Sequence, residues 1–222
     1  MTDALGLFSW PLLLIGAYLV GSIPSAQLLA RLKGIDLRQV GSGNIGAGNL
    51  THSVGPQWGL TAGVFDALKG LVPVLLARYV LDMGLAASGM AGLAAVIGHC
   101  WSIFVRGRAG RGLATSAGLV FVLDPVLLVW IGGWSLAGWR IGSGFAGFLG
   151  WGLLPLVAIA LSRPGTEILF LVLLATTLML RRAQGNPGDV EGANNVLRRL
   201  LYDRDPFEQV YGETAADEAP AS

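Results

Sequence analysis

The chain is dominated by apolar stretches of membrane-crossing length, separated by short loops rich in glycine, proline and charge. A hydrocarbon core about 30 Å thick requires about 20 helical residues, and a helix satisfies its own backbone groups in lipid. Composition agrees, because only 13% of the residues are charged and the mean hydropathy is +0.62. Soluble domains average about 25% charged residues. We therefore predict an all-α fold, a polytopic bundle of transmembrane helices.

The apolar stretches predict about seven spans. They run from Leu5 to Leu29, Trp58 to Val80, Ala86 to Phe104, Leu113 to Leu123, Val126 to Trp139, Phe145 to Leu161 and Glu167 to Leu180. The fourth and fifth are short and could together form one irregular hairpin. We assign residues 1–182 to a transmembrane domain and 183–222 to a partly disordered cytoplasmic tail, with a short amphipathic helix from Ala193 to Tyr202.

Lysine and arginine gather in alternate loops. The odd loops and the tail carry Arg31, Lys33 and Arg38 after the first span, Arg106, Arg108 and Arg111 after the third, Arg140 after the fifth, and Arg181 and Arg182 after the seventh, whereas the even loops have only Arg78 and Arg163. Cytoplasmic loops of membrane proteins carry an excess of these residues. The pattern predicts an N-terminus outside, a C-terminus in the cytoplasm, and a shared cytoplasmic side for the first and third loops.

The first loop contains a glycine-rich polar segment, from Gly41 to Asn49. Its four glycines, at 41, 43, 46 and 48, favour left-handed backbone, and successive N–H groups in such a segment can converge on one anion. A tight solvent-exposed turn is the alternative that Gly and Asn also favour. We predict that the segment binds a substrate phosphate through Gly41, Ser42, Gly43, Asn44, Gly46 and Asn49.

A second glycine-containing loop, from Arg106 to Gly112, leads directly into an apolar stretch. The N-terminus of a helix attracts anions through its free N–H groups and its dipole, and arginine binds phosphate through two parallel hydrogen bonds. Membrane topology alone would explain the positive charge, but not the interleaved glycines. We therefore predict phosphate binding at Arg108 and Gly110, and stabilisation of developing charge by Arg111.

Three ionisable residues fall inside the predicted spans. Asp66 and Lys69 lie three positions apart on one helix face, and charges at this depth are usually paired. His99 closes the third span. We interpret all three as structural support, with a proton-carrying His99 as the second interpretation. Because no cluster of metal-ligating residues has zinc spacing, we predict no metal and no cofactor. Ser143 lacks a serine-hydrolase motif around it.

Taken together, these motifs resemble the bacterial integral-membrane glycerol-3-phosphate acyltransferases that use acyl phosphate as donor. The resemblance extends from Gly21 to about Leu200. It is carried by Gly21 to Pro24, Gly41 to Asn49, Phe65 to Gly70, Gly98 to Phe104 and Gly110 to Thr115.

The resemblance implies seven transmembrane helices in a bacterial inner membrane, with the active site at the cytoplasmic face. It implies transfer of an acyl group from acyl phosphate to glycerol 3-phosphate, giving lysophosphatidic acid for phospholipid biosynthesis, without a metal or a separate protein base. The implied partners are the two substrates, membrane lipids and other lipid-synthesis enzymes. Nucleic acid is not among them, and the net charge of +1 agrees.

Matching the family's motifs also implies catalytic roles for Arg111, His52, Ser143 and Asn195. The chain departs from the family at several of its motif positions. Arg111 replaces a lysine, His52 replaces an arginine, and Gly48 replaces a threonine. In the third motif Gly192 falls where the family has histidine, although Asn195 still matches.

These departures motivate two further hypotheses. The same fold could accept a different polar alcohol as acyl acceptor. Alternatively, the chain could be a non-catalytic homologue that binds lipid phosphates at the cytoplasmic face. A transporter is disfavoured, because neither repeated halves nor paired broken helices are evident.

Overall fold

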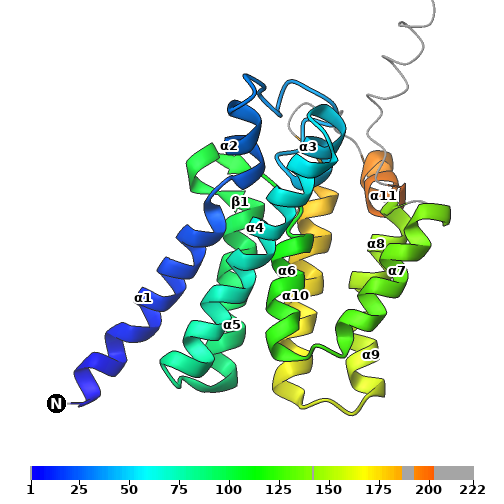
Figure 1. Ribbon diagram of the computed structural model, residues 1–222. Coiled ribbons are helices and arrows are strands. Elements are labelled where there is room, and N and C mark those ends of the chain that lie inside the picture. The colour runs from blue at the N-terminus through cyan, green and yellow to red at the C-terminus, as the bar shows by residue number, and fades with distance from the viewer. Residues whose placement is uncertain (1, 142, 187–192, 203–222) are drawn as a thin grey trace, which may run out of the picture.

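The computed structural model describes residues 2–141, 143–186 and 193–202. They form a bundle of helices that run side by side, with several short elements gathered at one end (Figure 1). The longer helices are α1 (Thr2–Ser22), α4 (Pro56–Leu75), α5 (Gly84–Cys100), α6 (Leu113–Leu123), α7 (Leu127–Ile141) and α10 (Gly165–Ala183). The predicted helical architecture is confirmed.

Shorter elements complete the fold. They are α2 (Ser25–Arg31), α3 (Ala47–Ser53), α8 (Ser143–Gly152), α9 (Leu154–Ala160), α11 (Ala193–Tyr202), the π-helical turn η1 (Leu76–Val80), the 3-10 turn η2 (Ile103–Val105) and the strands β1 (Trp101–Ser102) and β2 (Gly107–Arg108). The two strands pair antiparallel, with Trp101 opposite Arg108, and η2 connects them. The amphipathic helix α11 has the predicted bounds.

The outside of the bundle is apolar. Two helical stretches of the described chain, Ser9–Arg31 and Pro56–Val80, are long and apolar enough to cross a bilayer, and shorter apolar helices flank them. Large hydrophobic side chains face outward on several helices, among them Leu12, Leu60, Val129 and Leu156. Exposed apolar surface spread over neighbouring helices indicates contact with lipid.

Reciprocal glycine contacts bring the helices into close approach. At the crossing of α1 and α5, a Cβ on Gly21 would lie 2.0 Å from the Ala95 carbonyl oxygen, and one on Gly98 would lie 2.2 Å from that of Tyr18. Gly70 and Gly118 make equivalent contacts where α4 crosses α6. In a membrane no hydrophobic driving force acts between helices, and small residues at the interface allow their backbones to approach closely.

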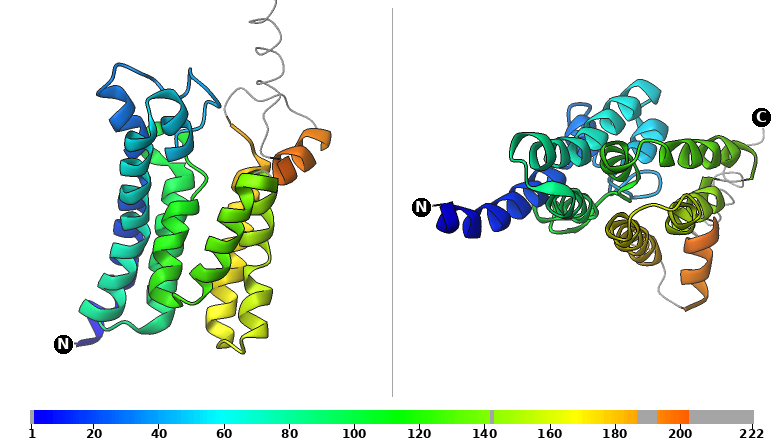
Figure 2. Two further views of the ribbon diagram at one scale, coloured as in Figure 1. Left: turned by 45° about the vertical axis from the view of Figure 1, so that its right-hand side comes forward. Right: turned by 90° about the horizontal axis from the view of Figure 1, so that it is seen from below.

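The largest apolar core of the described residues extends from α4, α5 and α6 through α10 to α7, α8 and α9, and its buried residues include Val74, Val96, Leu119, Leu171 and Leu154. Helix α10 packs against both α5 and α9, and so joins the two sides of the bundle. In Figure 2, α1, α4, α5 and α6 form one side and α7, α8 and α9 the other, with α10 between them.

Three predicted spans are interrupted or shortened in the structure. The first does not continue as one helix to Leu29, because it breaks at Ile23–Pro24 into α1 and α2. Proline lacks an N–H, and the residue before it avoids helical backbone. The third ends at Cys100, where the chain becomes the strand β1, and the sixth divides at Leu153. The fourth and fifth are separate helices, α6 and α7.

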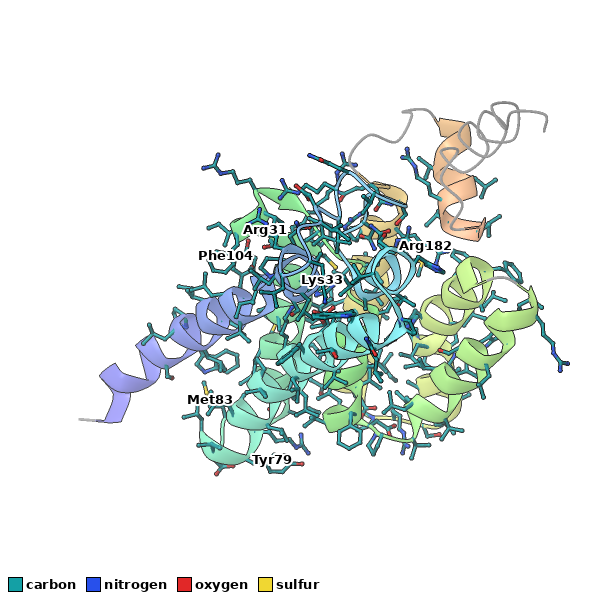
Figure 3. The ribbon with its side chains drawn as sticks, turned by 45° about the horizontal axis from the view of Figure 1, so that its top comes forward. Arg31, Lys33, Tyr79, Met83, Phe104 and Arg182 are labelled. Atoms are coloured by element: carbon teal, nitrogen blue, oxygen red, sulfur yellow. The ribbon has the colours of Figure 1, made fainter. Side chains whose placement is uncertain are left out.

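The two ends of the bundle differ in chemistry. Arg31, Lys33 and Arg182 lie toward the end that carries α2, α3 and the β1–β2 hairpin, whereas Tyr79 and Met83 lie toward the other end (Figure 3). The two loops that the sequence predicts to bind phosphate are therefore on the same, basic end.

Candidate functional site

The first glycine loop adopts the predicted left-handed backbone at two of its four glycines. Gly41 has φ +55° and Gly43 has φ +67°. The prediction is wrong for the other two, because Gly46 is extended (φ −147°) and Gly48 lies inside the seven-residue helix α3. The left-handed turn is therefore concentrated at Gly41 and Gly43, where the Gly43 N–H donates to the Val40 carbonyl at 3.1 Å, and α3 begins at Ala47.

Asn49 holds this loop together. Its side-chain amide donates to the carbonyls of Leu37, Val40 and Asn44 at 3.0–3.1 Å, and its Oδ1 accepts from the Ser42 N–H at 3.2 Å. The side chain is 5% exposed. The sequence predicted a direct phosphate donor, whereas these contacts occupy Asn49 with the loop backbone. Asn49 is therefore the residue that fixes the shape of the loop.

The second loop combines a hairpin with a helix start. After β2, the chain passes through Ala109 and Gly110, which are both buried, and reaches Gly112 in left-handed conformation (φ +81°). Gly112 caps α6, so the helix begins at Leu113 as predicted. Its first N–H groups face the loop that carries Arg108 and Arg111, and this is the geometry that attracts anions.

The two loops meet at a pair of glycines. A Cβ on Gly46 would lie 4.0 Å from the Gly110 Cα, which is ordinary van der Waals contact. A further link comes from Arg38, whose guanidinium donates to the Val105 carbonyl at 3.0 Å. The two loops therefore lie on one side of the molecule, as predicted, and the Arg38–Val105 hydrogen bond connects their chains directly.

Beneath the loops lies the buried group that the sequence predicts as structural support. Lys69 Nζ is 2.6 Å from Asp66 Oδ1, and Nζ also donates to the Ile23 carbonyl at the break between α1 and α2. His99 Nδ1 lies 3.6 Å from the same carboxylate oxygen, which is too long for a hydrogen bond. All three side chains are buried, with 3–8% exposure. They connect α4 and α5 to the chain break under the site.

His99 also limits the second loop. A Cβ on Gly110 would lie 1.9 Å from His99 Nε2, so no side chain fits at position 110 while His99 keeps its place. The imidazole therefore supports the backbone of the loop from below. This contact makes His99 a packing residue of the site.

The predicted catalytic residues have different surroundings. Arg111 is half-buried in the second loop, and His52 is exposed in the last turn of α3. Ser143 is the first residue of α8 and Asn195 belongs to α11, but both side chains lie outside the described residues. The Arg182 guanidinium links these two helices by donating to the Gly144 carbonyl at 2.6 Å and to that of Arg199 at 2.8 Å.

Sequence reasoning missed the residues at the end of α10. Arg181 is 1% exposed and donates to the Ala109 carbonyl at 2.6 Å and to the Gly185 carbonyl at 2.7 Å. Gln184 contacts the hairpin, and the Asn186 amide donates to the Ser42 carbonyl at 2.9 Å. The sequence pattern identified Arg181 only as a topology signal and placed Gln184 and Asn186 in the tail.

The fold and the loops define a helical membrane protein with two glycine-containing loops at its basic end. A family model described as glycerol-3-phosphate acyltransferase matches residues 11–190. The curated glycerol-3-phosphate acyltransferase of Geotalea daltonii is 34% identical over 194 residues, covering 84% of this chain and 97% of the relative. A curated glycerol-3-phosphate acyltransferase of Thermus thermophilus is 50% identical over 125 residues, covering 54% of this chain and 59% of the relative.

Solved structures agree. The crystal structure of PlsY (YgiH), an integral membrane glycerol 3-phosphate acyltransferase, in its glycerol 3-phosphate form has a TM-score of 0.75 and 29% identity, and the match covers 91% of this chain and 99% of that one. The lysophosphatidic acid form has a TM-score of 0.71. The chain belongs to the glycerol-3-phosphate acyltransferase family. These comparisons do not favour the non-catalytic alternative.

Proposed function

We propose that the protein transfers an acyl group from acyl phosphate to glycerol 3-phosphate, producing lysophosphatidic acid and inorganic phosphate. The site would be the end of the bundle where the two glycine loops meet. The proposal rests on membership of the acyltransferase family and on one observation of this chain, which is the close approach of the two loops at Gly46 and Gly110. Two loops of a kind that attracts anions are thereby close together, and this arrangement supports a reaction between two phosphate-bearing substrates.

Each loop has groups suited to a phosphate. In the first, the Ser42 hydroxyl and the N–H groups that the loop does not already bond internally would hold one phosphate, with Asn49 as organiser. In the second, Arg108, Arg111 and the N-terminus of α6 would hold the other. His52, exposed beside the first loop, would contact substrate from the rim.

The reaction needs placement and charge stabilisation. A glycerol hydroxyl oxygen bonds to the acyl carbonyl carbon, and the bond from that carbon to the phosphate oxygen breaks. The leaving phosphate keeps the electron pair, and a phosphate oxygen accepts the hydroxyl proton. Holding the reacting atoms about 3 Å apart removes much of the entropic barrier. Arg111 would stabilise the negative charge that develops as the carbonyl is attacked.

The orientation of the protein in the membrane follows from the charge at the end of the bundle that carries the two glycine loops. This end carries the basic residues Arg31, Lys33 and Arg182, and cytoplasmic loops are enriched in such residues. We place this end in the cytoplasm of a bacterial cell and the N-terminus outside, in a chain that crosses the inner membrane several times. The acyl chain would then remain among the helices while the phosphates are held at the surface.

The test is acyl transfer by purified protein in lipid, with palmitoyl phosphate and labelled glycerol 3-phosphate. Lysophosphatidic acid should form, and Arg111→Ala should reduce its rate by at least about 100-fold, the typical cost of losing one preorganised charge-stabilising donor. Arg31→Ala, at an exposed position of α2, is the matched control and should retain activity. Well-folded wild-type protein that forms no product would contradict the proposal.

A further inference from the structure

Gln184, the residue that follows the end of α10, is bound by both strands of the β1–β2 hairpin. The Trp101 indole N–H donates to Gln184 Oε1 at 2.8 Å, and the Arg108 guanidinium donates to the Gln184 backbone carbonyl. Trp101 and Arg108 are directly opposite each other in the β1–β2 pairing. Gln184 is therefore bound through its side chain and its backbone by a single cross-strand pair.

The chain then turns toward the first loop. Gly185 is left-handed (φ +63°), and its carbonyl accepts from Arg181, one turn back in α10. Asn186 follows, is 2% exposed, and donates to the Ser42 carbonyl at 2.9 Å. Residues 184–186, here called the strap, thus bridge the second loop and the first across 144 positions of sequence.

We propose that Gln184 is a positioning residue for phosphate binding, acting through Arg108 and through the strap. This inference rests on the proposed function, because it assumes that Arg108 and the Ser42 loop bind the substrate phosphates. Arginine has five N–H donors in a fixed planar fork. Anchoring one guanidinium nitrogen at the Gln184 carbonyl fixes the plane in which the remaining donors are presented.

The backbone of Gln184 is held to α10, because its N–H donates to the Leu180 carbonyl at 3.1 Å, and the Trp101–Gln184 bond is the side-chain contact that holds this residue to the hairpin. Gln184 itself is solvent-exposed, so apolar burial does not hold it in place. Without the indole contact, Gln184 is held to the hairpin, among the described residues, only through the Arg108 bond itself, so the Gln184 carbonyl is a less rigid anchor for the guanidinium. The side chain then has to be ordered on binding, which weakens the affinity for phosphate.

Two substitutions test the bond from its two sides. Trp101→Phe keeps an aromatic ring and removes the N–H donor. Gln184→Met keeps the length of the side chain and removes the acceptor. For full-length protein in lipid, the Kd of glycerol 3-phosphate and of a hydrolysis-resistant acyl phosphonate is measured by calorimetry, and KM and kcat are measured by acyl transfer.

In each variant we expect the Kd and KM of at least one of the two ligands to rise about 3- to 10-fold, the range for one net hydrogen bond. The change in kcat should stay within about twofold, and the double variant should be no worse than either single one, because both remove the same bond. Trp10→Phe, in α1, and Gln57→Ala, exposed at the start of α4, are matched controls that should keep wild-type values.

Other outcomes overturn the inference. If the Kd values of both ligands are unchanged in both variants, the inference is wrong, even if the unfolding temperature falls. A lower unfolding temperature with unchanged Kd values would mean that the Trp101–Gln184 bond is purely structural. The inference is also wrong if the fold-changes in Kd of the two single variants multiply in the double variant, because they would then act independently. Wild-type protein that binds both ligands without turnover would contradict the proposed function alone, since the Kd values still report on the strap. Wild-type protein that binds neither ligand overturns both.

Discussion

Gly110 and His99 meet so closely that a Cβ on Gly110 would lie 1.9 Å from His99 Nε2. The imidazole is buried, and its Nδ1 lies 3.6 Å from the carboxylate of the Asp66–Lys69 ion pair. The buried polar group and the second glycine-containing loop are therefore in direct contact through His99 and Gly110. A change in either one will be transmitted to the other.

Gly110→Ala should displace the second loop and reduce acyl transfer by at least about 10-fold, since displacements of about 1 Å at a reacting site have effects of this size or more. The measurement is the rate of lysophosphatidic acid formation together with the unfolding temperature. Gly48→Ala is the control, because a Cβ there has no described atom within 4 Å and alanine favours the helix α3. Equal activity of the two variants would contradict the role given to Gly110.

Asn49→Ala should loosen the first loop. The substitution leaves the carbonyls of Leu37, Val40 and Asn44 without their amide donor, and an unsatisfied buried polar group costs about 1–3 kcal/mol. We expect a lower unfolding temperature and a raised KM for at least one substrate. Ser53→Ala, which removes only a long 3.3 Å contact to Asn49, should have a small effect on both. A normal KM in Asn49→Ala would show that the loop keeps its shape without this residue.

Lys69→Met should leave the Asp66 carboxylate buried without its ion-pair partner. Breaking a buried pair on one side costs about 3–5 kcal/mol, whereas replacing both partners by uncharged residues is often tolerated. We therefore expect Lys69→Met to unfold more readily than the double variant Asp66→Asn/Lys69→Met, measured by thermal or denaturant unfolding in detergent. The reverse order would mean that Asp66 is stable without Lys69.

Gly70→Ala should separate α4 from α6. A Cβ at this position would lie 1.9 Å from the Thr115 backbone carbonyl oxygen, and backbone atoms move only if a whole helix moves. Overpacking of this kind costs about 1–3 kcal/mol. The matched control is Gly63→Ala on the same helix, where the nearest contact is an ordinary 3.9 Å. Unfolding measurements that fail to distinguish the two variants would contradict close packing at this crossing.

Local patterns in the sequence predicted those parts of the fold that depend on local chemistry. The bounds of α6 agree with the apolar stretch from Leu113 to Leu123, and α11 has its expected length. The Asp66–Lys69 pair is also a local feature, because two residues three apart on a helix necessarily share a face. The break at Pro24 was not predicted, because the residues on both sides of this proline are apolar and the first span was therefore extended through it.

The roles of individual glycines could not be assigned in the same way. Gly41 and Gly43 are required for their left-handed backbone, Gly110 for its contact with His99, and Gly70 for a helix crossing. All four look alike in the sequence. The reason for each glycine depends on what lies opposite it, and this is a property of the packed chain.

The sequence by itself determined that the chain forms apolar helices with two glycine-containing basic loops, because run length, charge and loop composition act over neighbouring residues. Only the tertiary structure decided which residues complete the site. Arg181 reaches Ala109 across 72 positions and Asn186 reaches Ser42 across 144. Contacts of this range depend on how the helices pack and leave no periodic signal in the sequence, so the folded bundle alone reveals that the end of α10 holds the two loops together.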